Sequence, residues 1–493
     1  MSTPARSSPA AQSDRADRAH QVHPDAPDAP DAPDARDVGD AVRAGPADGR
    51  GGGGILVLGG GQLGRMLGPA AARLDVPVTV LDPTPDCPAA AAVSRHVQGS
   101  FRDYQTVLQA ADEVRPDVVT VEIESVEVAA LRTLRDRGIS VHPAPEVLEV
   151  IQDKLAQRIR FQAAGLPVPR FMEVPGEVGA RGATPPAGRE HASGADGTKG
   201  HVGTDRAAAG EQTTDVRRAL ASFGLPAVQK LRFGGYDGRG VAVVAAPLQH
   251  ADGRDPDTTP GAALPLKGPS LLEERIDLAT ELSVLVARSP SGALRSYPPF
   301  EMEMDRELHL VRAVVYPAGT SPGIAEEAQH VAEATVAELD GVGIFAVELF
   351  VDTAGRVLIN EVAPRPHNSG HLTIEAAETD QFEQHLRAIL DLPLGSTHMR
   401  GAAAMVNLIG HDPEGPTQYD GLQNALGMPG VHLHLYGKHL CRGGRKMGHV
   451  TATAPDAHSA VDAALRAAEV VHIHGGAALD TAPQSDTPDR DAP

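Results

Sequence analysis

Short apolar runs alternate with segments of helical periodicity over the first ordered part of the chain. Residues 55–58, 78–82 and 117–122 are predicted strands, and the spacing of apolar residues predicts helices at 63–74 and 104–114. Strands that alternate with helices in this way are typical of an α/β domain with a parallel sheet. We expect this Rossmann-like domain to occupy residues 54–150.

The pattern changes after a predicted helix at 153–164. Short β-type runs with hairpin turns dominate up to about residue 392, which predicts a second domain of mixed α and β structure at 151–398. A small third domain is expected at 399–474, with strands at 403–408 and 431–436 and a helix at 460–471. Segments without apolar periodicity predict a disordered leader, two disordered insertions and a disordered tail. They are residues 1–53, 175–215, 251–268 and 475–493.

Charge and composition narrow the classes of partner. The formal net charge is −21, from 44 basic and 65 acidic residues, so nucleic acid and anionic membranes are unfavourable partners. A local group of arginines could still bind a small anionic substrate. The sequence has no apolar run of about 18 residues that could span a bilayer. Two isolated cysteines, Cys87 and Cys441, favour a reducing compartment, and we expect a cytoplasmic protein.

A glycine-rich turn follows the first predicted strand. Residues 59–64 have the sequence GGGQLG, which satisfies G-x-G-x-x-G, and Asp82 ends the next strand. Such a turn presents backbone amides and a helix N-terminus to a phosphate group. The pattern alone fits either a dinucleotide such as NAD(P) or the phosphate of a mononucleotide.

Two acidic residues stand at the end of the third predicted strand. Strand alternation would place Glu122 and Glu124 on the same side, with Ile123 opposite. Ligands of open α/β sheets bind at this end of the strands. Two solvated carboxylates would give the same pattern, so their meaning depends on context.

A second glycine-rich loop lies between two predicted strands of the middle domain. Residues 234–240 read GGYDGRG, with Lys230 shortly before them. Successive backbone amides in such a loop can surround phosphate oxygens, while the lysine and Arg239 supply positive charge. The loop has no GK[ST] sequence and is therefore not a Walker A loop.

Two glutamates lie on strands that a predicted hairpin joins. If Val351 pairs with Arg356 across a loop at 352–355, Glu348 and Glu361 become diagonal neighbours on one face. Two carboxylates beside the amide of Asn360 suit a divalent cation that bridges a nucleoside triphosphate. A register change of one residue would place the two acids on opposite faces.

Two further segments concentrate donors and positive charge. The sequence APRPHNSGH at 363–371 follows the second glutamate directly, and RGGRKMGH at 442–449 adds a basic cluster near Lys438. Both segments could bind an anionic substrate, and a solvated basic turn is the alternative for the second.

Taken together, these segments resemble the N5-carboxyaminoimidazole ribonucleotide synthases, a family of ATP-grasp ligases. The resemblance extends from about residue 55 to 470 and rests on eight motifs in the same order. They are GGGQLGRM, EIE, QDKLAQ, GGYDGRG, EERI with Glu281, INE, APRPHNSGH and RGGRKMGH. It implies an ATP-grasp architecture with a Rossmann-like pre-ATP-grasp domain and a small C-terminal domain.

The resemblance also implies roles for individual residues. ATP would lie between two sheets of the middle domain. The ATP-binding positions would be Lys154, Lys230, Gly235, Tyr236, Asp237, Gly238, Arg239, Gly240, Glu273, Glu274, Arg275, Ile276, Glu281, Asn360 and Glu361. The positions that bind aminoimidazole ribonucleotide would be Gln62, Leu63, Glu124, Arg239, Arg365, His367, Asn368, Ser369, Lys438 and Arg445. Glu348 and Glu361 would bind Mg²⁺, or Mn²⁺ in its place, and Lys230, Arg239 and Arg365 would act in catalysis.

The implied reaction is the ATP-dependent carboxylation of the ribonucleotide by bicarbonate in de novo purine biosynthesis, by a homodimeric enzyme. The chain departs from the family pattern at Ser125, at Leu372 and over residues 301–309. Three alternatives remain at this point. They are another ATP-grasp ligase such as a formate-dependent glycinamide ribonucleotide transformylase, an NAD(P)-dependent oxidoreductase, and a non-catalytic nucleotide-binding relative.

Overall fold

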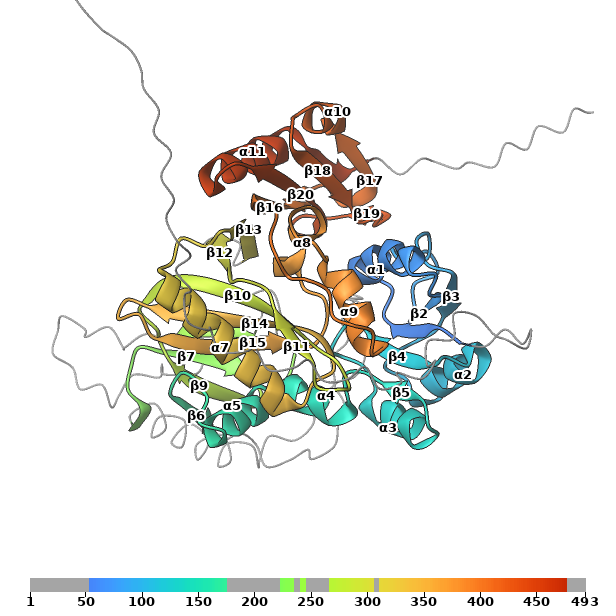
Figure 1. Cartoon of the computed structure of the whole chain (residues 1–493), viewed down its shortest axis with the longest axis horizontal. Coiled ribbons are helices and arrows are strands. Elements are labelled where there is room, and N and C mark those ends of the chain that lie inside the picture. Colours follow the sequence, from blue (N-terminus) through green and yellow to red (C-terminus); the bar gives the residue numbers. More distant parts are fainter. Residues whose placement is uncertain (1–52, 175–221, 235–239, 245–265, 306–309, 477–493) are drawn as a thin grey trace, which may run out of the picture. The chain divides into compact units, whose positions relative to one another are not determined.

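The fold is known from a computed structural model that describes residues 53–174, 222–234, 240–244, 266–305 and 310–476 (Figure 1). The expected insertion at 175–215 lies outside these residues, as do most of the leader, of the insertion at 251–268 and of the tail. The described part contains a parallel sheet and several antiparallel sheets, each associated with helices. The predicted α/β class, with α+β character in the middle of the chain, is confirmed.

The first sheet is fully parallel, with strand order β3-β2-β1-β4-β5. Its strands are β1 (Ile55–Leu58), β2 (Val78–Asp82), β3 (Arg95–Gln98), β4 (Val118–Val121) and β5 (Ser140–Val141). The first two and β4 were predicted. The sequence did not reveal β3, whose residues are partly exposed, or β5, which is two residues long.

Four helices accompany this sheet, and apolar clusters fill both of its faces. They are α1 (Gln62–Arg73), α2 (Tyr104–Val114), α3 (Val128–Asp136) and α4 (Pro145–Gln152). The helices predicted at 63–74 and 104–114 correspond to α1 and α2. Helix α1 also packs on α9 (Gln381–Ile389), a helix from much later in the chain.

The middle part of the chain contributes two sheets. The smaller one has order β6-β9-β7-β8 and is antiparallel. Its strands are β6 (Phe171–Val174), β7 (Ala227–Leu231), β8 (Val241–Val244) and β9 (Ser270–Glu274), and α5 (Lys154–Ala163) precedes them.

The larger sheet has nine strands among the described residues, in the order β15-β14-β10-β12-β13-β16-β20-β18 with β11 beside β10. From the middle of the chain come β10 (Leu278–Arg288), β11 (Leu294–Ser296), β12 (Phe300–Asp305), β13 (Leu310–Tyr316), β14 (Gly343–Asp352) and β15 (Val357–Ala363). Later residues supply β16 (Ala402–Ile409), β18 (Val431–Leu435) and β20 (Lys446–Ala454). The sheet therefore continues across the domain boundary that we expected at 398–399.

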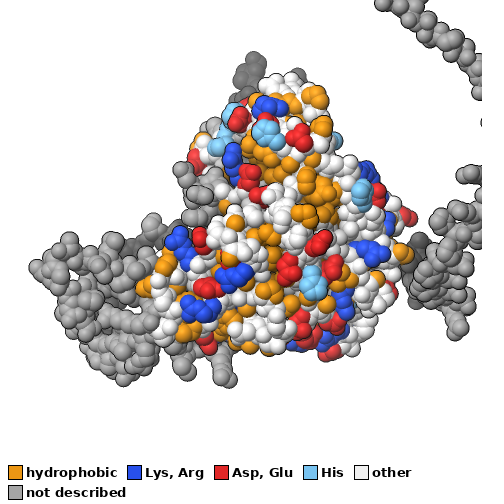
Figure 2. Space-filling view, turned by 60° about the vertical axis from the view of Figure 1, so that its left-hand side comes forward, with side chains coloured by type: hydrophobic (Ala, Val, Ile, Leu, Met, Phe, Trp, Pro, Cys, Tyr) orange, Lys and Arg blue, Asp and Glu red, His pale blue; other side chains and the backbone are white. Residues whose placement is uncertain are grey.

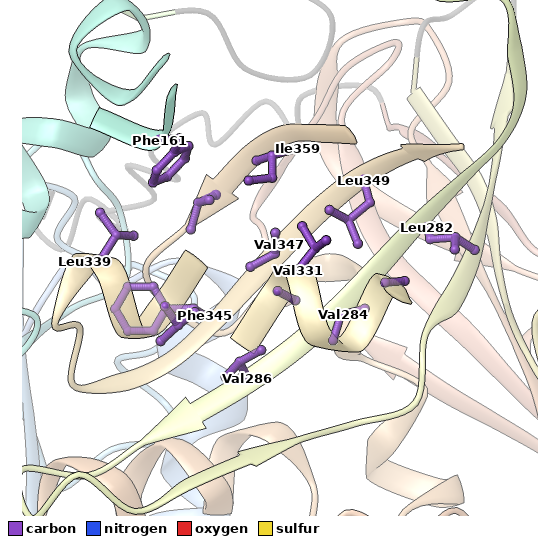
Figure 3. Close-up of a cluster of buried hydrophobic side chains, with 14 of the residues drawn as sticks. Phe161, Leu282, Val284, Val286, Val331, Leu339, Phe345, Val347, Leu349 and Ile359 are labelled. Carbon is purple, nitrogen blue, oxygen red and sulfur yellow. The ribbon is translucent and has the colours of Figure 1, made fainter. Parts of the chain in front are cut away.

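Helix α7 (Pro322–Leu339) covers one face of β10, β14 and β15 in this sheet. In Figure 3, Val331 and Leu339 of this helix lie against Val284, Val347 and other side chains of β10, β14 and β15. These residues are almost completely buried. Their packing holds β14 and β15, the strands that carry Glu348 and Glu361, on a rigid support.

The remaining elements connect and cover these sheets. After β15 come the 3₁₀ turn η2 (Asn368–Gly370), α8 (Thr373–Ala376) and α9. The last part adds β17 (Gly415–Asp420), β19 (Leu440–Cys441), β21 (His472–Gly475), α10 (Leu422–Leu426) and α11 (Ala457–Val470), and α11 packs on β16 and β20.

Both cysteines are buried and unpaired. No helix within the described ranges has the length and apolar character that a bilayer crossing requires. On the face shown in Figure 2, acidic and basic side chains are intermingled, so this face has no continuous basic surface of the kind that binds nucleic acid.

Candidate functional site

Glu348 and Glu361 lie directly opposite each other on the neighbouring strands β14 and β15. The predicted register was wrong by one residue, because Val351 pairs with Val357 rather than with Arg356. That shift alone would have separated the two carboxylates onto opposite faces. The register then changes: Leu349 pairs with Ile359, but the next residue, Glu348, pairs with Glu361. Asn360 is therefore an extra residue in β15. This β-bulge returns Glu361 to the face of Glu348.

Two lysines approach this pair from other elements. The Nζ atom of Lys154, the first residue of α5, lies 3.1 Å from Oε2 of Glu361. The Nζ atom of Lys230, on β7 of the smaller sheet, donates to Oδ1 of Asn360 at 2.9 Å. Carboxylates from one sheet and ammonium groups from α5 and the other sheet thus meet at one place.

The electrostatic environment treats the two glutamates differently. For Glu361, burial would raise the pKa, but Lys154 and Lys230 outweigh it and lower the pKa to about 2. For Glu348, burial raises the pKa to about 8, with further contributions from Glu361 and Glu281. Burial likewise raises the pKa of Glu281 to about 7, although Lys230 partly opposes it. The carboxyl groups of Glu281, Glu348 and Glu361 therefore lie in a region with too little positive charge for all three to be ionised.

This donor set fits a hard divalent cation. Glu348 is largely buried, and its raised pKa shows that its carboxylate lacks a compensating positive charge, which a bound cation would supply. Within the described ranges, no group of three or more His, Cys, Asp or Glu side chains is arranged to hold a metal by itself. Mg²⁺ is commonly held by one or two carboxylates together with phosphate oxygens and water, so two protein ligands are sufficient.

A buried ion network lies behind the lysines. Glu273 of β9 accepts from Nε of Arg158 at 2.7 Å and from Nζ of Lys230 at 2.8 Å. Burial would raise the pKa of Glu273, but Arg158 and Lys230 lower it to about 2. Burial lowers the pKa of Lys230 despite the attraction of Glu273. The carboxylate is therefore ionised and fixes the position of the lysine.

The other residues expected at an ATP site are placed as follows. Glu274 ends β9, and its carboxylate accepts from the backbone amide of Arg170 at 3.1 Å. Arg275 and Ile276 belong to the short link between β9 of the smaller sheet and β10 of the larger one. The loop residues Gly235, Tyr236, Asp237, Gly238 and Arg239 lie outside the described residues. Gly240 is described, and its carbonyl accepts from Leu231 at 2.8 Å, which closes the base of the hairpin.

The segment after β15 extends from the carboxylate pair toward the first domain. His367 Nε2 lies 3.6 Å from Oε1 of Glu348, and its Nδ1 is 2.9 Å from Oγ of Ser369. Arg365 forms an ion pair with Glu124 at 2.7 Å. Asn368 exchanges two hydrogen bonds with Asn407 of β16, a partner that the sequence did not reveal.

The acidic segment that contains Glu124 is not part of a strand. Strand β4 ends at Val121, so the predicted strand alternation of Glu122 and Glu124 is wrong. The two acids point to different partners, because Glu122 binds the glycine-rich turn while Glu124 binds Arg365.

Glu122 occupies the amides that a dinucleotide phosphate would need. Its carboxylate accepts from the backbone amides of Gly61, at 2.5 Å, and Leu63, at 3.0 Å, and Asp82 accepts from the amide of Gly60. A pyrophosphate at this helix N-terminus would meet two carboxylates and no free amide at these positions. The geometry therefore disfavours the NAD(P) interpretation.

The two basic residues expected at a phosphate site lie in the C-terminal part of the chain. Nζ of Lys438 donates to the carbonyl of Lys446 at 2.6 Å, and Arg445 donates to the carbonyl of Leu440 at 2.7 Å. Burial and the neighbouring Arg442 lower the pKa of Arg445. Lys446 was not among the expected site residues, yet its positive charge acts on Glu348.

Three histidines form a stack that links the segment after β15 to β18 and β20. The ring of His449 stacks on His371 at 4.7 Å and on His434 at 4.5 Å between centroids. Burial lowers the pKa of both His371 and His449 far below the ordinary value, so these two are neutral. Their role is to pack the motif APRPHNSGH against the motif RGGRKMGH.

Comparisons with known proteins agree with this geometry. Three family descriptions match the chain. They are a ribonucleotide synthetase preATP-grasp domain at 54–152, an ATP-grasp domain at 198–382 and a phosphoribosylaminoimidazole carboxylase C-terminal domain at 403–463. An N5-carboxyaminoimidazole ribonucleotide synthase from Synechococcus elongatus is 36% identical over 408 residues, which cover 82% of this chain and 90% of that protein.

The chain belongs to the N5-carboxyaminoimidazole ribonucleotide synthase family.

Solved structures of the same synthase family support this assignment. A synthetase from Thermotoga maritima superimposes with a TM-score of 0.69 at 34% identity, over 86% of this chain and 99% of the other. A synthase from Aspergillus clavatus, solved in complex with ADP and 5-aminoimidazole ribonucleotide, gives a TM-score of 0.67 at 31% identity, over 85% and 98% of the two chains. Family membership makes the chain an ATP-dependent ligase.

Where the chain departs from the synthase pattern, the substituted residues have structural partners. Ser125 accepts from Arg102 at 2.7 Å, and Leu372 is completely buried in the apolar cluster below β10. Glu301 accepts from Thr280 and from the amide of Gly319, while residues 306–309 of the same segment lie outside the described part. The departures leave the contacts between Glu348, Glu361 and the lysines intact.

Proposed function

We propose that the chain catalyses the ATP-dependent carboxylation of 5-aminoimidazole ribonucleotide by bicarbonate, as a step of de novo purine biosynthesis. The products are N5-carboxyaminoimidazole ribonucleotide, ADP and phosphate. The observation that carries the proposal is the meeting of Glu348 and Glu361 with Lys154 and Lys230 at one place, in a chain whose family is established.

The reaction proceeds in two steps, phosphorylation of bicarbonate and carboxylation of the amine. A bicarbonate oxygen attacks the γ-phosphorus of ATP, the bond to the β-phosphate oxygen breaks, and ADP leaves. The carboxyphosphate formed has a phosphate leaving group, which bicarbonate itself lacks. The amine nitrogen of the ribonucleotide then bonds to the carboxyl carbon, phosphate leaves with the bonding electron pair, and the nitrogen loses a proton.

We assign ATP to the region between the two sheets of the middle domain. Lys154 and Lys230 supply fixed positive charge to the phosphates, together with the loop at 235–240. The segment 273–276, Glu281 and Asn360 complete the ATP site. Glu348 and Glu361 would hold Mg²⁺, or Mn²⁺, which neutralises charge on the transferred phosphoryl group. Lys230, Arg239 and Arg365 are the proposed catalytic residues.

The ribonucleotide is assigned to the region beside the segment 365–369. In this segment Arg365 pairs with Glu124 of the first domain and His367 lies near Glu348. Ser369 bonds to His367, and Asn368 bonds to Asn407 of β16. The remaining proposed contacts are Gln62, Leu63, Arg239, Lys438 and Arg445. This arrangement would bring the amine of the ribonucleotide toward the phosphorylated bicarbonate while a closed site excludes water.

The domain boundaries at 54–150, 151–398 and 399–474 remain our proposal, as do a homodimeric assembly and a cytoplasmic location. Light scattering coupled to gel filtration measures the assembly directly. A mass of one chain, 51.3 kDa, would refute the homodimer.

The function is tested by measuring ADP release with a panel of amine acceptors, each with bicarbonate or with formate. We expect release to depend on aminoimidazole ribonucleotide and bicarbonate together. Release that required glycinamide ribonucleotide and formate would identify the transformylase alternative instead. No stimulation by any acceptor, in a protein that binds ATP, would favour a non-catalytic relative.

A further inference from the structure

We propose that Arg158 is a positioning residue that holds the β-bulge at Asn360 and thereby places Glu361 opposite Glu348. The inference rests on the proposed function, because it concerns the carboxylate pair assigned to the divalent cation. Arg158 does not contact either of these glutamates in the described structure. Its effect would pass through the backbone of β15.

The bulge is the feature that makes the pair possible. The ladder is regular from Val351, which pairs with Val357, to Leu349, which pairs with Ile359. If this register continued, Glu348 would lie opposite Asn360. Glu361 would then face the other side of the sheet. A bulge inserts one residue, disrupts the local ladder and leaves backbone groups without their strand partners. Something other than the ladder must therefore bind the carbonyl of Asn360.

Arg158 provides that bond. Its Nη2 atom donates to the backbone carbonyl of Asn360 at 2.5 Å. The side-chain oxygen of Asn360 accepts from Nζ of Lys230 at 2.9 Å. Both oxygens of the extra residue are therefore held by cations, one through the main chain and one through the side chain.

The two cations are themselves tied together. Glu273 accepts from Nε of Arg158 at 2.7 Å and from Lys230 at 2.8 Å, which closes a ring of four residues with Asn360. The side chains of Arg158 and Glu273 are only 3% and 2% exposed. Water cannot replace these bonds, so the ring is rigid.

The planar guanidinium is suited to this position. It donates through Nε to Glu273 and through Nη2 to Asn360 in one fixed fork, which a lysine ammonium at the same place cannot reproduce. Arg158 also follows Lys154 by one turn of α5, and Lys154 bonds to the Glu361 side chain. Helix α5 thus contacts the main chain of the bulge through Arg158 and the carboxylate of Glu361 through Lys154.

The test compares Arg158→Lys and Arg158→Met with the wild type. Mn²⁺ binding in the presence of ADP, followed by electron paramagnetic resonance, is expected to weaken at least tenfold in both variants. The KM for Mg²⁺ in ADP release is expected to rise in parallel, while ADP affinity without metal changes less than threefold. Arg160→Lys is the matched control, because Arg160 lies on the same helix and pairs with the half-exposed Glu338.

A buried ion pair with a purely structural role predicts a different result. If Arg158 had only that structural role, the folded Arg158→Lys variant would bind Mn²⁺ as the wild type does, or its affinities for metal and for ADP would fall equally. Either result would overturn the inference. A crystal structure of the wild type with Mn²⁺ and ADP supplies a measurement that needs no variant. Loss of the Arg158 to Asn360 bond there would also overturn it.

The same measurements separate this inference from the proposed function. If Mn²⁺ binding depends on Arg158 but the ribonucleotide is not carboxylated, the acceptor is wrong and the positioning role stands. If the wild type with ADP binds no Mn²⁺, both the metal assignment and the positioning role fail.

Discussion

Replacing Glu361 by glutamine should abolish turnover and leave the fold intact. The change removes one negative charge from the carboxylate pair and keeps the size and hydrogen-bonding shape of the side chain. Two unit charges 4 Å apart interact by about 4 kcal/mol at an effective dielectric constant of ~20. An effect of this size, lost from phosphoryl transfer, corresponds to about a 10³-fold fall in kcat.

The cost to stability should be much smaller. Glu361 forms its ion pair with Lys154, but its side chain is 44% exposed, so solvent screens the pair. Such pairs contribute roughly 1 kcal/mol or less. The substitution also removes the repulsion that helps to raise the pKa of Glu348 to about 8, where burial is the first cause. We therefore expect Tm to change by no more than about 5 °C.

The assay measures ADP release at saturating substrates together with thermal unfolding. Glu327→Gln, on the exposed face of α7, serves as the control for loss of a carboxylate elsewhere. A folded Glu361→Gln protein that keeps more than a tenth of the wild-type kcat would refute the assignment of this carboxylate to the metal. Loss of activity accompanied by unfolding would refute the argument about stability.

Three further outcomes follow from the site. Burial raises the pKa of Glu281 from 4.5 to about 7; Lys230 opposes this shift and Glu361 adds to it. Between these two pH values the folded protein therefore binds more protons than the unfolded chain. The Tm of the ligand-free protein should therefore fall as pH rises from 5 to 8, and less steeply in Glu281→Gln; an identical slope in the two proteins would contradict this. Removal of divalent cations with EDTA should stop ADP release, and added Mg²⁺ or Mn²⁺ should restore it, whereas activity in excess chelator would exclude the metal. Glu122→Gln replaces a carboxylate that accepts from two amides of the glycine-rich turn. The KM for the ribonucleotide should therefore rise about tenfold, while the KM for ATP stays unchanged. A change in the KM for ATP instead would show that this turn serves the other substrate.

Local sequence patterns were sufficient for most of the elements that have strong periodicity. Helix α2 has the predicted bounds, β1 was identified by its continuous apolar residues and β2 by its mainly apolar ones. These segments are governed by burial of their own side chains, which the order of residues reveals directly. Strand β3 has mostly exposed or half-buried residues and joins the sheet by its backbone bonds to β2, so its sequence carries little signal.

The chemistry of the site was also visible before its geometry. The order of the motifs indicated a family of ligases, and the comparisons confirm that family. The two carboxylates were expected on neighbouring strands, and Lys154 and Lys230 were expected at the ATP site; the structure brings these four residues together. Their individual roles remain predictions that the experiments above test.

The tertiary structure decided how those residues meet. Nothing in the sequence of β15 marks Asn360 as an extra residue, because the bulge depends on Arg158 and Lys230, which lie more than a hundred residues earlier. Nor does the EIE segment reveal that β4 stops at Val121 and that Glu122 turns to the amides of α1. Periodicity reports which side of an element is buried, whereas register, bulges and ion pairs arise between elements. The sequence by itself thus determined the fold class, the family and the residue types of the site, and long-range contacts decided their arrangement.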